Sequence, residues 1–114
     1  MKSYTDIKQS KKLLQSGLNP DTADMCWGLD AESGMYNNHP YPMPWKDYTA
    51  KSFYIPCWSL AALLDVMPSG NILINDVKSN RYKIICSLMD SEFHDDPIDA
   101  CVEMIVKLKE NKLI

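Results

Sequence analysis

The segment IPCWSLAALLDVMP, residues 55–68, constrains the fold of this chain more than any other stretch, because it is the most apolar continuous segment. Ser59 is placed to cap a helix from Leu60 to about Val66, since its hydroxyl can accept a hydrogen bond from an otherwise unpaired backbone N–H. Pro68 and the turn after it end this helix. A helix that is apolar on most sides is expected to be buried on most sides, at the centre of the fold.

A β-hairpin and a long helix are predicted after this segment. Residues 71–75 and 81–88 are rich in β-branched and aromatic side chains, and residues 76–80 between them have turn chemistry. Asp96 and Pro97 begin the last helix, since aspartate caps a helix and proline suits its first position. The apolar stripe of this helix consists of Ile98, Cys101, Val102, Ile105 and Leu108, with Met104 beside it.

The first part of the chain adds one helix and weak strand signals. Ser3 or Thr5 is predicted to cap a helix that ends by about residue 16, because Gly17 suits the left-handed position past a helix end. Residues 25–27 and 52–55 are each predicted to supply a short strand. The predicted fold is therefore α+β: a single two-layer domain spanning residues 1–114, in which about three helices cover a small antiparallel sheet made of the hairpin and one or two short strands.

Charge and cysteine content restrict the function classes. The net charge is −3, from 15 acidic and 12 basic side chains, and this disfavours a nucleic-acid partner, which usually requires a basic face. The sequence has neither a signal segment nor 18 consecutive apolar residues, so we expect a cytoplasmic protein without a membrane partner. The cysteines form no C-x-x-C pair and are expected to be free thiols. They are Cys26, Cys57, Cys86 and Cys101.

Aromatic side chains and prolines are concentrated in the middle of the chain. Eight of the eleven aromatic residues lie between Trp27 and Trp58, and this long segment also contains four prolines. Such residues are enriched in protein interfaces, but they also hold loops against a domain and can stack on small ligands or bases. The candidate binding residues are Tyr36, His39, Tyr41, Trp45, Tyr48 and Tyr54.

Candidate catalytic and metal-binding residues are few. The motifs G-x-S-x-G and H-E-x-x-H and a glycine-rich phosphate loop are absent. Cys57 precedes a capped helix, and His39 is a possible base for it, but a buried cysteine explains this position better. Cys26, His39 and Cys57 lack the spacing of a zinc ribbon or finger.

One acidic cluster contains residue types that bind divalent cations. A solvated loop whose last aspartate caps the following helix explains this cluster better than a metal site does. We therefore predict no catalytic residue, no metal site and no cofactor. The cluster consists of Glu92, His94, Asp95 and Asp96.

Three segments carry a resemblance to a known group of proteins. They are QSKKLLQSGLNPDTADM, PCWSLAALLDVMP and DDPIDACVEMIVKLKENKLI, and they cover a little under half of the chain. In these segments the chain resembles small proteins of unknown function that are encoded in prophages and other mobile elements of gut bacteria. The resemblance implies a single α+β domain and a phage-related setting. It implies no activity, cofactor or site residue.

We therefore expect a non-enzymatic accessory protein, related to phages or mobile elements, that acts as a protein interaction module. It would present the aromatic loop and the partly covered sheet face to another protein or to a second copy of itself. The alternative is an enzyme or small-ligand-binding protein with a cleft under the aromatic loop 36–58, in which His39, Trp45 and Cys57 take part. A weaker alternative is a nucleic-acid-associated phage protein that stacks bases on aromatic rings.

Overall fold

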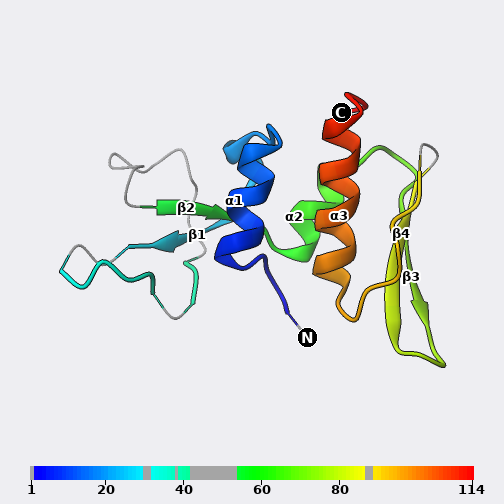
Figure 1. Ribbon diagram of the computed structural model, residues 1–114, viewed down its shortest axis with the longest axis horizontal. Helices are drawn as coiled ribbons and strands as arrows, with labels where there is room; N and C mark the ends of the chain where they lie inside the picture. Colours follow the sequence, from blue (N-terminus) through cyan, green and yellow to red (C-terminus); the bar gives the residue numbers. More distant parts are fainter. Residues whose placement is uncertain (1, 30–31, 38, 42–53, 87–88) are drawn as a thin grey trace.

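The computed structural model describes residues 2–29, 32–37, 39–41, 54–86 and 89–114. In this part of the chain three α-helices and two antiparallel sheets of two strands each form an α+β fold, which confirms the predicted fold class. The molecule measures 45 × 31 × 19 Å, and the two sheets lie at its opposite ends with the helices between them (Figure 1). No helix in the described ranges has the length and hydrophobicity needed to cross a lipid bilayer.

The strands pair in two separate sheets rather than in the single sheet expected from the sequence. The predicted hairpin is present, but the two short strands pair with each other because the helices stand between them and the hairpin (Figure 1). The helices are α1 (Ile7–Gln15), α2 (Leu60–Asp65) and α3 (Pro97–Glu110), with a 3₁₀ turn at Pro20–Thr22. The strands are β1 (Met25–Gly28) paired with β2 (Tyr54–Cys57), and β3 (Ile72–Asp76) paired with β4 (Arg81–Ile85).

Helix α3 is the centre of the core. It packs against α1, α2 and β4, and its buried residues include the five of the predicted apolar stripe and Met104 beside it. Asp96 caps its N-terminus as predicted, by accepting a hydrogen bond of 2.9 Å from the backbone N–H of Ile98. Helix α2 begins at the predicted cap, where the Ser59 hydroxyl accepts a hydrogen bond from the Ala62 N–H. Both helix starts were therefore encoded by local capping chemistry.

The cap of α1 differs from the prediction. Asp6, not Ser3 or Thr5, is the N-cap: its carboxylate accepts a 2.7 Å hydrogen bond from the Gln9 N–H, and the Gln9 side chain accepts one of 3.1 Å from the Asp6 N–H. This reciprocal pair is a capping box. Gly17, with a φ of +99°, occupies the left-handed position past the helix end, as predicted.

Strand β1 lies between two extended segments. On one side the N–H and C=O groups of Cys26 bond to the backbone of Tyr41, over 2.9 and 2.8 Å, and on the other side Cys26 lies opposite Pro56 of β2. Because Cys26 directs both backbone groups at Tyr41, its pairing with Pro56 requires no hydrogen bond. A proline, which has no N–H, is therefore accommodated in this strand.

Thr5 is a fully buried polar residue that connects α1 to both strands of the first sheet. Its hydroxyl oxygen lies 2.8 Å from the Ser10 hydroxyl and accepts a 3.1 Å hydrogen bond from the Trp58 N–H. Its carbonyl accepts hydrogen bonds from the Trp27 indole N–H, over 3.2 Å, and from the Cys57 thiol, over 3.3 Å. Because buried polar groups are stable only when hydrogen-bonded, this network fixes α1 relative to β1 and β2.

Replacing Thr5 with valine tests this network. Thr5→Val keeps the shape of the side chain but leaves the buried Trp58 N–H and Ser10 hydroxyl without their partner. The free energy of unfolding, measured by urea denaturation, should fall by about 1–3 kcal/mol for each group left unsatisfied. The control is Ser3→Ala, an exposed position at which the change should stay within about 0.5 kcal/mol. Equal effects of the two substitutions would contradict the role assigned to Thr5.

The end of α3 offers a stabilising substitution. Lys112 has a φ of +57°, and the hydrogen bond from the Leu113 N–H to the Leu108 carbonyl, 2.8 Å long, depends on this left-handed residue. Since a left-handed backbone is unfavourable for residues with a Cβ, Lys112→Gly should raise the free energy of unfolding by about 0.5–1 kcal/mol. Lys109→Gly, inside α3, should lower it by about 1 kcal/mol in the same assay.

Candidate functional site

The predicted aromatic candidates are only partly brought together. Trp45 and Tyr48 lie outside the described residues. Tyr41 and Tyr54 lie beside Gly28: a Cβ at this glycine would be 3.2 Å from a ring carbon of Tyr41 and 3.7 Å from one of Tyr54. The missing side chain of Gly28 thus makes room for both rings. The Tyr41 hydroxyl accepts a 2.8 Å hydrogen bond from the Asn37 side chain, and the residue as a whole is 42% exposed.

Tyr36 and His39 have different surroundings from this pair. Tyr36 is half-buried, and the Lys11 ammonium lies 5.7 Å from the centre of its ring, within cation–π range. His39 is exposed. Tyr36 is therefore engaged with α1, which agrees with loop packing, whereas Tyr41 keeps an accessible ring that can contact a partner.

The cysteine considered as a nucleophile is a buried thiol. Cys57 is completely buried, and burial raises the pKa of its thiol to about 12, although a hydrogen bond with Thr5 acts in the opposite direction. Burial also raises the pKa of Cys101 to about 12. Both groups are protonated at neutral pH, and a protonated thiol is a poor nucleophile. The geometry thus favours the structural interpretation of Cys57.

The acidic cluster before α3 does not converge on one point. Asp96 caps α3, as predicted, while the Asp95 carboxylate lies 3.4 Å from the Arg81 Nε and the His94 imidazole lies 3.1 Å from the Glu103 carboxylate. Across the described residues, no three or more His, Cys, Asp or Glu side chains are grouped so as to bind a metal ion. His94, Asp95 and Asp96 instead contact separate partners, and Glu92 contributes its backbone N–H to the Glu103 carboxylate.

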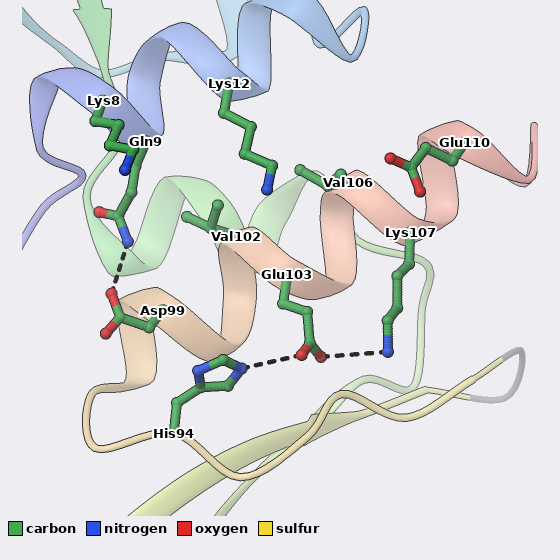
Figure 2. A pocket seen from close by; sticks show the side chains of 10 residues that line it. All are labelled: Lys8, Gln9, Lys12, His94, Asp99, Val102, Glu103, Val106, Lys107 and Glu110. Atoms are coloured by element: carbon green, nitrogen blue, oxygen red, sulfur yellow. Dashed lines mark hydrogen bonds and ion pairs between the residues drawn. The ribbon is translucent and has the colours of Figure 1, made fainter.

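A cleft of about 520 Å³ lies between α1 and α3 (Figure 2). Val102 and Val106, one turn apart on α3, form its apolar floor, and Lys8 and Lys12, one turn apart on α1, form one wall. His94 stands at one end of the cleft. The remaining lining residues are Gln9, Asp99, Glu103, Lys107 and Glu110.

Glu103 is the most connected acidic side chain of the cleft. Its carboxylate lies 3.1 Å from the His94 Nε2, accepts a 2.7 Å hydrogen bond from the Glu92 N–H, and lies 3.5 Å from the Lys107 ammonium. Burial acts to raise the pKa of Glu103, but the hydrogen bonds from Glu92 and His94 and the charge of Lys107 outweigh it, and the pKa is lowered. Glu103 is therefore ionised at neutral pH. Its negative charge is compensated by the Lys107 ammonium on the same helix, α3.

The α1 wall of the cleft carries two lysines, Lys8 and Lys12, whose positive charges are not compensated in this way. Asp99 is bonded to the Lys2 ammonium, over 2.7 Å, and to the Gln9 amide, over 2.6 Å. Lys8 and Lys12, by contrast, form no ion pair with any residue that the structure describes. In Figure 2 the Lys12 ammonium extends over the valine floor. The cleft thus combines an apolar floor with two lysines on its α1 wall.

The sequence did not indicate this cleft. It showed Lys8 and Lys12 only as part of the polar side of a short helix, and no motif predicts that this helix faces α3. The available signal was the i, i+4 spacing of the two lysines, which matches the spacing of Val102 and Val106.

The comparisons with known proteins found no matching family model, no similar curated protein and no similar solved structure. The resemblance to prophage-encoded proteins therefore stays a prediction from the sequence. The functional argument depends on the geometry of the cleft and of the exposed surfaces.

The lowered pKa of Glu103 predicts a pH dependence of stability. When the folded-state pKa lies below the unfolded value, the ionised group stabilises the fold above the unfolded pKa, and this contribution is lost as the pH falls through the folded pKa. The free energy of unfolding should therefore decrease as the pH falls below the ordinary glutamate value of 4.5. Glu103→Gln should be less stable at neutral pH and should show a weaker decrease, measured by urea denaturation across this range.

The matched control is Glu110→Gln, an exposed glutamate on the same helix. Glu110 has no ion-pair partner within the described ranges, so its substitution should leave the pH dependence unchanged. Identical pH profiles for Glu103→Gln and the unmodified protein would show that the Glu103 contacts do not stabilise the fold.

Proposed function

We propose that the protein is a non-enzymatic interaction module whose α1–α3 cleft binds an acidic, amphipathic segment of a partner protein. The observation that carries this proposal is the combination of Lys8 and Lys12 with an apolar floor. Asp99 and Glu103 are already paired with the ammonium groups of Lys2 and Lys107, and the remaining acidic residue, Glu110, lies at the C-terminal end of the cleft (Figure 2). A ligand with carboxylates beside an apolar side chain complements this arrangement.

The length of the cleft favours a helical peptide over a compact small molecule. Its lining runs from Asp99 to Glu110 on α3, which at 1.5 Å per residue spans roughly 16 Å. Lys8 and Lys12 are one turn apart, so carboxylates one turn apart on a partner helix would face them in register. Docking of an amphipathic helix into a groove between helices is a recurrent mode of peptide recognition.

Two further observations support the proposal. The protonated state of Cys57 supports a non-enzymatic role, because it removes the nucleophile that the sequence offered. The phage- or mobile-element-related setting is supported by the resemblance of the three sequence segments described above.

A second interaction surface is favoured by the rings beside Gly28. Tyr41 is held by the Asn37 amide and by backbone bonds to Cys26, yet remains 42% exposed. A tyrosine fixed in this way loses little side-chain entropy when a partner covers it. This surface is the described part of the aromatic loop that the sequence predicted to be an interface.

The cleft proposal can be tested with a synthetic peptide. The probe is a three-turn helical peptide that carries glutamates one turn apart beside a leucine stripe, added to isotope-labelled protein and followed by NMR. We expect shift changes at Val102 and Val106 and along α1, and an affinity that falls with salt. Replacing Lys8 and Lys12 together with glutamate should weaken binding by about tenfold or more, because two attractions become repulsions.

The control is Lys11→Glu, which makes on the same helix the charge change of one of these two substitutions. Lys11 lies over the Tyr36 ring rather than in the cleft, so this variant should retain most of the affinity for the peptide. Equal weakening by Lys11→Glu would show a general charge effect. Equal binding of a peptide with lysines in place of the glutamates would contradict the proposal.

A further inference from the structure

The hairpin at the far side of α3 has one covered edge and one open edge. The covered edge belongs to β4: the N–H and C=O groups of Tyr82 bond to the backbone of His94, over 2.6 and 2.7 Å. Two residues further on, the Ile84 N–H donates to the Ser91 hydroxyl and the Ile84 carbonyl accepts from the Ser91 N–H, each over 2.9 Å. Tyr82 and Ile84 therefore direct their backbone groups away from β3.

The register of the hairpin then fixes which groups of β3 face outward. Leu73 lies opposite Ile84, and Asn75 lies opposite Tyr82. Because backbone directions alternate along a strand, these are non-hydrogen-bonded pairs, and the N–H and C=O groups of Leu73 and Asn75 point to the open edge. Those four groups have no hydrogen-bond partner in the part of the chain that the structure describes.

Strand β3 has few of the features that usually protect an open edge. Its sequence, ILIND, contains no lysine, arginine or proline, and its pairing with β4 continues through all five residues without a bulge. Its one charged residue, Asp76, is the last of the strand, and its carboxylate accepts hydrogen bonds from Lys78 and Ser79 in the turn. Ile72 is 58% exposed at the start of the strand. Natural proteins usually protect such an edge with charges, proline or bulges, so a flat edge with one charge at its end and three apolar residues before it points to strand pairing with another chain.

We propose that β3 pairs antiparallel with β3 of a second copy of this chain, with Leu73 of each copy opposite Leu73 of the other. In this register the outward groups of Leu73 and Asn75 find partners, and Ile72 of each copy packs against Ile74 of the other. Asp76 lies opposite Gly70, so no like charges meet. The two hairpins form one four-stranded sheet around a two-fold axis.

The choice of a second copy follows from the number of edges. The other edge of the hairpin is covered by residues 89–94, so each copy offers one open edge at this end of the molecule. Pairing like edges gives a closed dimer instead of a growing filament. No residue of β3 lines the α1–α3 cleft, so dimer formation leaves the cleft accessible and does not depend on its proposed function.

Sedimentation equilibrium over a range of protein concentrations tests the dimer. The unmodified protein should approach twice the monomer mass at high concentration. Asn75→Pro removes an outward N–H without removing a bond to β4, and Ile72→Lys places a charge on the edge. Each should weaken self-association by about tenfold or more. The control, Val77→Lys, changes a residue of the turn outside β3 that is 87% exposed. This variant should dimerise as the unmodified protein does.

A cross-linking experiment tests the register and remains informative if Asn75→Pro does not fold. In the proposed pairing, residues 72 and 74 of opposite copies form non-hydrogen-bonded pairs, with Cα atoms about 4.5 Å apart, a separation that suits a disulfide. The double variant Ile72→Cys, Ile74→Cys should form a covalent dimer on mild oxidation, whereas Ile72→Cys alone and the unmodified protein should not. A monomer at all concentrations without cross-linking would overturn the proposal. Efficient cross-linking of Ile74→Cys alone would overturn the register.

Discussion

The hydrogen bonds of Thr5 are the interaction on which the first half of this structure depends. One buried hydroxyl and one buried carbonyl receive donors from Trp27, Cys57 and Trp58, so the start of α1, both strands of the first sheet and the entry to α2 are held at one point. Apolar packing alone would allow these elements to slide, because it is not directional. The polar network gives them a single arrangement.

Helix α3 has the corresponding role in the second half, but through apolar contact. Its buried surface contacts α1, α2 and β4 at once, so it covers the hairpin sheet and separates it from the first sheet. The α1–α3 cleft exists because α1 is fixed at its N-terminal end by Thr5 and by the contacts of Gln9 with Asp99. The position of Lys8 and Lys12 over the valine floor is thus a consequence of both the polar network and the apolar helix.

The sequence predicted what is encoded locally and failed where distant residues decide. Asp96 and Ser59 cap their helices by contacts within three residues, and both were identified. The cap of α1 was misassigned because Ser3, Thr5 and Asp6 all have suitable side chains. The burial of Thr5 depends on a residue 53 positions away. The cleft was missed for the same reason, since its walls lie about ninety residues apart in the chain, as the Gln9 contact with Asp99 shows.

The contacts of Lys2 have a consequence for how the chain acquires its structure during synthesis. The backbone N–H of Lys2 donates to the Asp96 carboxylate and its ammonium binds Asp99, so the segment before α1 gains these partners only when residues 94 and 97 positions later have been made. Until α3 emerges, α1 lacks its contacts with that helix and depends on its capping box and on the Thr5 network with Trp27, Cys57 and Trp58, because an isolated helix of this length is marginal in water. The contacts of Lys2 and Gln9 with α3 can therefore form only after the partners of Thr5 have been made, so α1 acquires its two sets of contacts in two steps.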